Sequence, residues 1–486
     1  MELKVKFLKL SAGRPVAIMH KKIAEKSSIH VDGRISIRKN SRKIIAVVDI
    51  AVGMFEKDEI AVSTEISEEL HLKEGDNVEV ESAPCPKSIS IISKKLKCKR
   101  LDEREIKEII QDIVENALTE SEIAYFVSAI YKCGMTKKEV IGLTQAILET
   151  GKRLNLHKKI IVDKHSIGGI PGRTTPIIVS ICAAAGLIMP KTSSRAITTP
   201  AGTADALETI CKVDFTISEI RKIIKKTGAC MVWGGSLGLA PADDKIIQVE
   251  RMMNLDPNEQ LLASIMAKKL AMGSKYVLIE IPYGKYAKVN KQEARNLEKK
   301  FGSLAKSFNI KVKCFIVKTS EPMGNGIGPA LEIKDVISVL KRETRNSLLE
   351  SRALKLSAEI LEMAGKSKKG QGIALAREIL ESGTAFKKFQ QIIQAQKGKI
   401  NHIPEAKFSH IINSSKSFKI KIMDIKNLNS LARVLGCPVD KIAGIYLHKH
   451  LHDKVKKGEK LLTLFAESKA LLKAGINFYH KNMPIK

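Results

Sequence analysis

The feature of this sequence that most constrains its fold is the alternation of short apolar runs with helical stretches between about residues 158 and 340. The apolar runs include KKIIVD, ACMVWG and KYVLIEI, and helical segments separate them. Strands that alternate with helices in this way form a largely parallel sheet covered by helices. The sequence therefore predicts a central α/β domain. Ligands of such domains bind on the loops that follow the strands.

The regions on either side of this alternation have different residue patterns. β-branched residues alternate with polar ones in several runs before residue 84, for example in DNVEVESA, which predicts strands. Three capping boxes then mark helix starts at Asp102, Thr119 and Thr136, each with a Glu three residues further on. The chain becomes β-rich again from about residue 405. The alternating region is thus one part of a larger assembly of domains.

A chain of 486 residues suggests roughly three or four domains. We expect a multidomain fold that combines α/β and α+β parts. The expected parts are a β-rich N-terminal domain at 1–84, a helical domain at 95–158 completed by about 240–272, the central α/β domain at 159–345, a helical connector at 346–404 and a β-rich C-terminal α+β domain at 405–486.

The basic character of the chain favours anionic ligands. Its formal net charge is +31 at pH 7, and a field of this sign concentrates nucleotides, phosphate and nucleic acid. However, the lysines are spread along the whole chain, and aromatic residues, which form base-stacking platforms, make up only 4% of it. Dedicated binding of nucleic acid is therefore the less favoured interpretation.

The sequence does not support a membrane protein, an exported protein or a metal protein. The longest apolar stretch, near Ile177 to Met189, is interrupted by Ser180 and is too short to span a bilayer. No signal-peptide pattern is seen, so we expect a cytoplasmic protein. The eight cysteines are scattered without a C-x-x-C pair, which predicts reduced thiols rather than zinc ligands or disulfides. The histidines of HKHLH, residues 448–452, lack a carboxylate or cysteine cluster, so we expect no metal.

One loop of the central domain has the composition of an anion site. In IIVDKHSIGGIPGRTTP, residues 160–176, a strand ends in an acid and a helix begins near Thr174. Glycines let backbone amides approach a ligand, and a helix start offers unpaired N–H groups and the positive end of a dipole. Lys164 and Arg173 add charge. The spacing excludes a Walker A loop, and a flexible turn with solvated side chains is the alternative interpretation.

A second loop, in PKTSSRAITTPAGTADALET at residues 190–209, is rich in serine and threonine and carries one arginine. It also follows a strand and leads into a helix. Thr203 lies near the helix start, where its hydroxyl would either cap the helix or face a ligand. Two such loops in one α/β domain favour a shared anion site.

A third stretch, LDPNEQLLASIMAKK at residues 255–269, supports two interpretations. Asp256 precedes a proline and has Glu259 three positions further on, which is the pattern of a helix N-cap. Ser264 and Lys268 lie one turn apart on one helix face and could reach a ligand. A solvated helix face is the more common outcome for such a pair.

These stretches carry a family resemblance. DKHSIGG and KTSSRAITTPAGTADALE resemble the signature region of the thymidine and pyrimidine nucleoside phosphorylase family. VWGGSLGLAPADDKIIQVER, LDPNEQLLASI, GIYLHKH and the β-rich N-terminal segment are similar to its archaeal AMP phosphorylase branch. The resemblance covers essentially the whole chain. It implies a helical domain and a phosphate-binding α/β domain that face each other across a cleft.

The resemblance also implies a reaction. AMP and orthophosphate would give adenine and ribose 1,5-bisphosphate, with orthophosphate as co-substrate and without a cofactor. The glycosidic bond would break through an oxocarbenium-like centre, and orientation and charge stabilisation would supply most of the catalysis. A homodimer or a larger homo-oligomer is the implied assembly.

Individual residues acquire implied roles by their match to the family motifs. Asp256 matches the proposed proton donor to the departing adenine. Such a donor has to carry a proton near neutral pH, whereas helix amides at an N-cap favour the ionised carboxylate, so local physics and family role conflict there. His165 and Lys268 are further candidates. The implied phosphate ligands are Lys164, Ser166, Thr175 and Ser193. The implied nucleotide contacts are Gly168, Gly169, Ser194, Arg195, Ala196, Ile197, Thr198, Thr199, Thr203, Ser264 and Lys288.

Two positions depart from the family pattern. The first loop lacks an asparagine that the family commonly has, so Gly172 runs directly into Arg173 and the loop is one residue short. Pro200 stands where a small residue is expected. Both departures bear on phosphate affinity. A pyrimidine nucleoside phosphorylase acting on uridine or thymidine is the runner-up function, and a non-catalytic nucleotide- or RNA-binding protein is a third, which the shortened loop favours.

Overall fold

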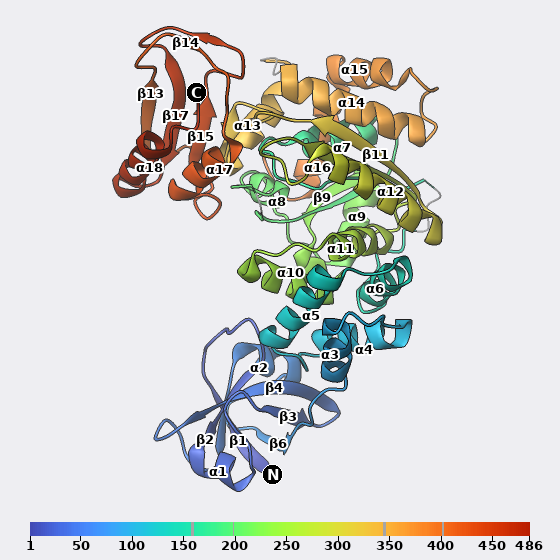
Figure 1. Cartoon of the computed structure of the whole chain (residues 1–486), viewed down its shortest axis with the longest axis vertical. Coiled ribbons are helices and arrows are strands. Elements are labelled where there is room, and N and C mark those ends of the chain that lie inside the picture. The colour runs from blue at the N-terminus through green and yellow to red at the C-terminus, as the bar shows by residue number, and fades with distance from the viewer. Residues whose placement is uncertain (157–159, 198, 344–346, 401–402) are drawn as a thin grey trace. The chain divides into compact units, whose positions relative to one another are not determined.

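The computed structural model of the chain describes residues 1–156, 160–197, 199–343, 347–400 and 403–486 (Figure 1). These residues form two compact units. The first joins Met1–Gly151 with Ala240–Ala267, and the second joins Lys152–Leu239 with Lys268–Lys486. The elements confirm the expected fold, with β-rich, helical, α/β and α+β parts in that order. None of the described helices is long and apolar enough to cross a membrane.

The N-terminal part of the first unit is a closed barrel. Its strand order is β1-β5-β2-β4-β3-β6, and closure leaves no free edge. Alternate residues of each strand point inward, which buries Ile35, Ile37 and Ile60 completely. The helices α1 (Lys21–Lys26) and α2 (Thr64–Leu70) belong to this part. The strands are β1 (Glu2–Phe7), β2 (Val16–His20), β3 (Arg34–Lys39), β4 (Arg42–Ala51), β5 (Glu59–Val62) and β6 (Asn77–Ser82).

Helices make up the rest of the first unit. The side chains of Asp102, Thr119 and Thr136 each accept a hydrogen bond from the backbone N–H three residues on, and the Glu at that position bonds back to the cap. The three predicted capping boxes are therefore confirmed. The helices are α3 (Ser88–Leu96), α4 (Glu103–Val114), α5 (Glu120–Cys133), α6 (Lys137–Glu149) and α10 (Pro241–Met253), while α11 (Asn258–Ala271) runs from the first unit into the second.

The prediction that the cysteines are reduced is wrong for two of them. Cys98, just after α3, and Cys133, at the end of α5, form a disulfide, with their Cα atoms 5.2 Å apart. Helix packing brings together two residues that are 35 positions apart in sequence, and cysteine spacing alone carries no sign of it. Of the cysteines that remain free, Cys182 and Cys230 are buried and Cys85 is exposed.

The second unit is built around a parallel sheet. The strand β7 (Val162–Ser166) pairs in parallel with β10 (Tyr276–Tyr283), which pairs in parallel with β11 (Lys311–Lys318). On the other side, a parallel bridge from Ile161 to Ile188 leads to β8 (Met189–Ser193) and then β9 (Ala229–Trp233). The order is therefore β11-β10-β7-β8-β9. The chain builds outward from β7 to β9 and restarts at β10, so the strand order reverses between β7 and β10.

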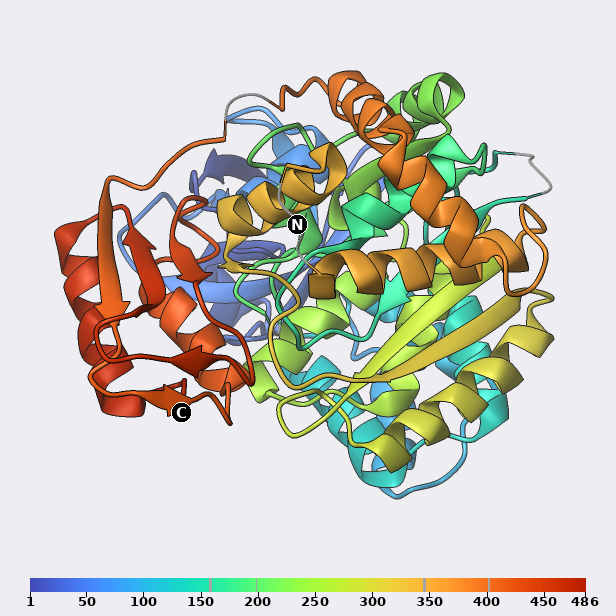
Figure 2. The same ribbon diagram turned by 90° about the horizontal axis from the view of Figure 1, so that it is seen from above.

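Helices cover this sheet, and α7 (Thr174–Ala184) lies in the middle of the core. Its first ten residues are all buried, as expected for a helix that is apolar on every side. It packs against α14 (Ser347–Met363) and α16 (Thr384–Ala395), as Figure 2 shows from above. The remaining elements around the sheet are α8 (Thr203–Leu207), α9 (Ile217–Thr227), α12 (Lys291–Ser307), α13 (Pro329–Lys341) and α15 (Gly372–Glu381).

The C-terminal α+β part takes one strand from the α/β part. Its sheet has the order β12-β15-β17-β13, and β12 lies just before α13 in the chain. The last two helices pack on this sheet and on each other (Figure 2). The elements are β12 (Gly326–Ile327), β13 (Phe408–Asn413), β14 (Phe418–Lys419), β15 (Gly444–Leu447), β16 (Lys454–Val455), β17 (Lys460–Ala466), α17 (Ile425–Val434) and α18 (Lys469–Asn482).

Two of the three histidines of the HKHLH motif bond to protein groups. The His448 ring bonds to Thr463 Oγ1 at 2.8 Å, and the His450 ring bonds to Glu321 at 2.9 Å and to Asn325 at 3.0 Å. In the described part of the chain, no group of three or more histidine, cysteine or acidic side chains is placed to hold a metal ion.

Candidate functional site

The first predicted ligand loop lies where the strand order of the sheet reverses. The loops that follow β7 and β10 flank this point, which is where open α/β sheets bind their ligands. Gly169 in the first loop lies against Lys288 in the second, because a Cβ atom at Gly169 would be 3.4 Å from the Lys288 backbone nitrogen. Gly169 has a φ angle of 96°, a conformation that favours glycine. Two predicted nucleotide contacts from distant parts of the sequence are therefore side by side.

Lys164 is a buried cation beside the start of α7. Its Nζ atom is 2.7 Å from a Glu280 carboxylate oxygen and 3.4 Å from the Thr174 hydroxyl. Arg352 of α14 binds the other Glu280 oxygen at 3.0 Å. Burial raises the pKa of Glu280, but Lys164 and Arg352 hold it below its usual value. The structure therefore fixes a positive charge at a helix N-terminus, as a site for an anion requires.

Two further buried lysines belong to this cluster, and the sequence reasoning did not identify them. Lys269 Nζ is 2.7 Å from one oxygen of Asp163, and Lys191 Nζ is 4.0 Å from the other. Burial, reinforced by Lys269, lowers the pKa of Lys191 to about 7. Burial and the surrounding lysines hold the pKa of His165 well below its usual value. The His165 imidazole is therefore neutral at pH 7 and can serve as a hydrogen-bond donor or acceptor.

Positive charge exceeds negative charge in this cluster. Four buried basic groups, the three lysines and Arg352, face the two carboxylates of Asp163 and Glu280, so positive charge is in excess even with Lys191 only about half charged at pH 7. Unbalanced buried charge is costly, and a bound anion relieves it. At the end of the neighbouring strand β8, the buried Ser193 hydroxyl has no hydrogen-bond partner among the described residues. Excess charge and a free hydroxyl donor suit an oxyanion such as phosphate.

The shortened Gly172–Arg173 segment is held in place by hydrogen bonds and an ion pair to distant parts of the chain. The Gly172 N–H donates to Glu332 at 3.3 Å, and Arg173 Nε is 2.5 Å from the same carboxylate oxygen. A Cβ atom at Gly172, whose φ is 109°, would lie 2.5 Å from that of Met323. The expectation that Arg173 adds charge for a ligand is therefore wrong. Its side chain is committed to Glu332 and, in the second loop, to Ala201 O and the Thr199 hydroxyl.

The second loop is held by Asp205 of α8. Asp205 Oδ2 accepts the N–H groups of Ala196 at 2.7 Å and of Gly202 at 2.8 Å. Gly202 is the N-cap residue and Thr203 is the first residue of α8, so of the two alternatives for the Thr203 hydroxyl the capping role does not hold. The Arg195 guanidinium is held by both Glu208 oxygens, at 2.7 and 2.9 Å. Of the other residues predicted in this loop, Ser194 and Ile197 are exposed, and Thr198 lies outside the described residues.

The third stretch has its own hydrogen-bond network in the first unit. Ser264 donates to the buried Asp243 carboxylate at 2.7 Å, and Gln260 donates to its other oxygen at 3.1 Å. The carboxylate of Asp243 thus orients the face of α11 that carries Ser264. Asp256 is exposed and lies two residues before the first residue of α11.

The missed residues had signals in the sequence that were too weak to use. Asp163 is an acid at the end of an apolar run, and Lys191 stands inside the strand segment MPKTS. Lys269 follows Lys268 directly, and only the helical phase of α11 decides that Lys269 is the buried one. The strongest of these weak signals is a charged residue in an apolar strand, because such a residue is seldom buried without a partner.

Three family domains match the chain. The helical bundle domain of the glycosyl transferase family matches residues 89–151, and the a/b domain of that family matches residues 158–386. The pyrimidine nucleoside phosphorylase C-terminal domain matches residues 419–486. The matches follow the order of the helical, α/β and C-terminal parts described above.

Similar proteins extend the match to full length. The AMP phosphorylase of Pyrococcus furiosus is 42% identical over all of this chain and 98% of its own length. A putative thymidine phosphorylase of Ralstonia nicotianae is 38% identical over 92% of this chain and 88% of its own. The crystal structure of anthranilate phosphoribosyltransferase from Thermus thermophilus matches with a TM-score of 0.54 and 16% identity, over 63% of this chain and 99% of that one. This last likeness concerns the fold alone.

Proposed function

Because the chain belongs to the AMP phosphorylase family of nucleoside phosphorylases, we propose that it cleaves the N-glycosidic bond of AMP with orthophosphate. The products are adenine and ribose 1,5-bisphosphate. The observation that carries the proposal is the excess of buried positive charge around Lys164, where four cations face two carboxylates at the point of strand reversal.

Lys164 and the groups around it hold the attacking phosphate. The buried Lys164 ammonium and the free Ser193 hydroxyl supply charge and a donor, and the start of α7, with Thr175, supplies unpaired N–H groups and a further hydroxyl. Ser166 is the last residue of β7, at the head of the same loop. A phosphate fixed in this way reacts as if it were highly concentrated, because its orientation is set before reaction. His165, which is neutral at pH 7, adds a hydrogen bond without adding charge.

The proposed reaction forms one bond, breaks one bond and needs one proton donor for the departing base. A phosphate oxygen forms a bond to C1′ while the bond from C1′ to the adenine nitrogen breaks, and the departing base takes up a proton. Asp256 is the proposed donor. Lys268 and Ser264 are proposed to bind the nucleotide, and the Asp243 carboxylate holds Ser264 in place.

The remaining nucleotide contacts come from the second unit. Gly168, Gly169, Lys288 and the loop at 194–199 with Thr203 are proposed to hold AMP. Within the loop the Arg195 guanidinium is occupied by Glu208, so its contribution to AMP binding comes from the backbone. No cofactor beyond the co-substrate phosphate is proposed. A cytoplasmic location and a homodimer or larger homo-oligomer complete the proposal, and sedimentation of the purified protein tests the assembly.

Base release is the direct test. The protein is incubated with AMP, CMP, GMP, UMP or uridine, each with and without phosphate, and free base is measured by chromatography. We expect adenine from AMP only when phosphate is present, together with an equal amount of a sugar bisphosphate. Adenine release that is independent of phosphate would indicate hydrolysis and would contradict the proposal.

A pyrimidine nucleoside phosphorylase is the second candidate, and the similarity to the putative thymidine phosphorylase of Ralstonia favours it. Uracil from uridine, without adenine from AMP, would support this candidate. If no base is released and RNA binds tightly with a steep dependence on salt, the non-catalytic nucleic-acid-binding alternative is favoured.

A further inference from the structure

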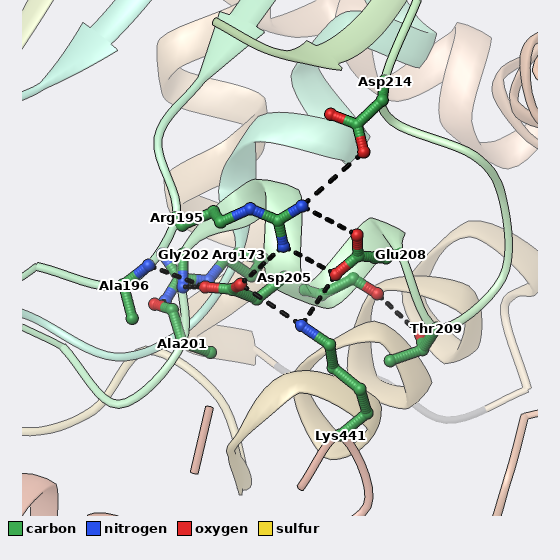
Figure 3. Close-up of polar contacts among 11 residues, drawn as sticks. Arg173, Arg195, Ala196, Ala201, Gly202, Asp205, Glu208, Thr209, Asp214 and Lys441 are labelled. Carbon is green, nitrogen blue, oxygen red and sulfur yellow. Dashed lines mark hydrogen bonds and ion pairs between the residues drawn. The ribbon is translucent and has the colours of Figure 1, made fainter. Parts of the chain in front are cut away.

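The loop that carries residues 194–199 is tied down by one buried carboxylate. Asp205 Oδ2 accepts both the Ala196 and the Gly202 N–H groups, at 2.7 and 2.8 Å, so a single oxygen atom bridges two points of the loop (Figure 3). The Asp205 side chain is only 3% exposed. The position of this carboxylate therefore sets the shape of the loop between residues 196 and 202.

The other Asp205 oxygen faces two cations. Lys441 Nζ is 3.3 Å and Arg195 Nη1 is 3.5 Å from Asp205 Oδ1. The same cations bind Glu208 Oε2, at 2.8 Å for Lys441 and 2.7 Å for Arg195. The hydrogen bond from Arg195, and after it Lys441, lower the pKa of Glu208 to about 2, although burial opposes them. Arg195, Asp205, Glu208 and Lys441 thus form a network of two cations and two carboxylates, called here the Asp205 network, and Asp214 lies at its edge, 3.7 Å from Arg195.

One of its four members comes from the C-terminal part of the chain. Lys441 lies between α17 and β15, and its backbone carbonyl accepts the Ala330 N–H at the start of α13, at 2.9 Å. A second basic residue of the same part, Arg433 in the last turn of α17, donates to Ile197 O at 2.9 Å. The C-terminal part therefore contacts the loop region in two ways. The Lys441 ammonium pairs with the Asp205 carboxylate, and Arg433 donates a hydrogen bond to the backbone carbonyl of Ile197.

We propose that Lys441 is a positioning residue, through which the C-terminal part of the chain sets the affinity of the site for the nucleotide. Without Lys441, Arg195 alone would have to neutralise two neighbouring carboxylates. The like charges of Asp205 and Glu208 would then repel each other. A displaced Asp205 would lose the Ala196 and Gly202 N–H groups, and the loop would lose its fixed shape. This inference rests on the proposed function, because the role of the loop in holding AMP belongs to that proposal.

The kinetic test compares Lys441 with a lysine in a similar ion pair away from the loop. Lys449, also in the C-terminal part, pairs with Glu459 at 3.1 Å, and its side chain is 25% exposed against 29% for Lys441. We expect Lys441→Ala to raise the KM for AMP about tenfold, with kcat and the KM for phosphate within about twofold of the parent. Lys441→Arg restores the charge and should recover most of the loss. Lys449→Ala should leave all three constants unchanged.

Arg433→Ala gives a second, independent variant. It removes one hydrogen bond to Ile197 O and no member of the Asp205 network, so a smaller rise in the KM for AMP, about threefold, is expected. An unchanged KM for AMP in Lys441→Ala overturns the inference. So does a rise in both KM values together with a lower melting temperature that Lys441→Arg does not correct, since that pattern indicates a general loss of structure.

A spectroscopic readout separates this inference from the proposed function. Trp233 is the single tryptophan of the chain, and the Arg195 guanidinium lies 4.6 Å from its ring centroid. Loss of Lys441 should shift Arg195 and change the tryptophan emission of the substrate-free protein, whereas Lys449→Ala should not. If the parent enzyme releases adenine, the KM pattern decides. If it releases none, the proposed function fails, and the emission alone decides whether Lys441 positions Arg195: a spectrum unchanged in Lys441→Ala overturns that role.

Discussion

The two predicted ligand loops of the α/β part differ in how the charges around them are paired. Around the loop after β7, buried cations outnumber buried carboxylates four to two. Around the loop after β8, two cations and two carboxylates form the Asp205 network, with Asp214 at its edge, 3.7 Å from Arg195. The first loop therefore has positive charge to offer a ligand, whereas the charges near the second are occupied by each other.

This difference indicates a division of labour. Excess charge binds an anion strongly but gives little shape selectivity, whereas a loop fixed by paired charges presents backbone groups and hydroxyls in a set geometry. We infer that phosphate affinity depends mainly on the first loop and nucleotide affinity mainly on the second. Arg173 links them, because it is the N-cap residue of α7 and its side chain reaches Thr199 and Ala201 in the second loop.

The largest effect is expected from Lys164→Met, which removes the cation beside α7 and leaves Glu280 paired with Arg352. We expect kcat/KM to fall about 10³-fold, the usual range for loss of a fixed group that stabilises the reacting charge. The KM for phosphate should rise more than the KM for AMP. Steady-state kinetics with each substrate varied in turn measures both values.

An exposed lysine of the same unit gives the control for this variant. Lys225 lies in the last turn of α9 and is exposed, so Lys225→Met should behave like the parent. If Lys164→Met weakened AMP binding and left phosphate binding intact, the assignment of the two loops would have to be exchanged.

Asp256→Asn tests the chemical step independently of ligand binding by the two loops. The amide keeps the size of the side chain but cannot donate the acidic proton, so kcat should fall about 10²-fold, a typical contribution of general acid catalysis. The KM for AMP should stay within about threefold of the parent value, because no binding charge of either loop changes. Unchanged turnover in a protein with the parent circular dichroism spectrum would reduce Asp256 to a structural role.

Gly202→Ala tests the second loop alone. The φ of Gly202 is −91°, which any residue can adopt, but a Cβ atom there would lie 2.4 Å from Ser194 O. The loop would have to shift, at a cost of about 1–3 kcal/mol, and we expect the KM for AMP to rise about tenfold while the KM for phosphate changes little. Gly302→Ala in α12 is the control, since its added Cβ atom meets nothing within 4 Å. Equal effects of Gly202→Ala on both KM values would remove the distinction between the loops.

The sequence predicted the strands, helices and loops around the two sites better than it predicted which charged side chains pair with each other. Periodicity identified the parallel sheet, and the capping boxes identified helix starts, because both depend on residues close in sequence. The position of the loops after β7 and β8 followed from the same alternation. Local pattern was thus sufficient to predict where these two loops lie in the fold.

The pairing of charges could not be read in the same way. Arg173 looked available to a ligand, yet its partner Glu332 is far away in the chain. Lys441, Asp205 and Arg195 are likewise brought together only by the tertiary fold. The disulfide between Cys98 and Cys133 was missed for the same reason. Long-range partners decide which charges remain for a ligand, and a single sequence does not contain them.

The smallest effect is expected from Lys191→Met, and its dependence on pH sharpens the account of the first loop. Burial lowers the pKa of Lys191 from its ordinary value of 10.5 to about 7 in the folded protein. The charged lysine therefore destabilises the fold, fully below pH 7 and less and less as the pH rises from 7 to 10.5, because the unfolded chain keeps the proton over that range. Lys191→Met should raise the melting temperature at pH 6 and have little effect at pH 10.

Lys191→Met should also weaken phosphate binding by a few fold at pH 6, since it lowers the excess of buried charge. Sulfate, which does not titrate here, serves as the probe in calorimetric titrations of both proteins. A lower melting temperature of Lys191→Met at pH 6 would mean that the cluster is balanced without a ligand, and the contrast between the two loops would then be lost.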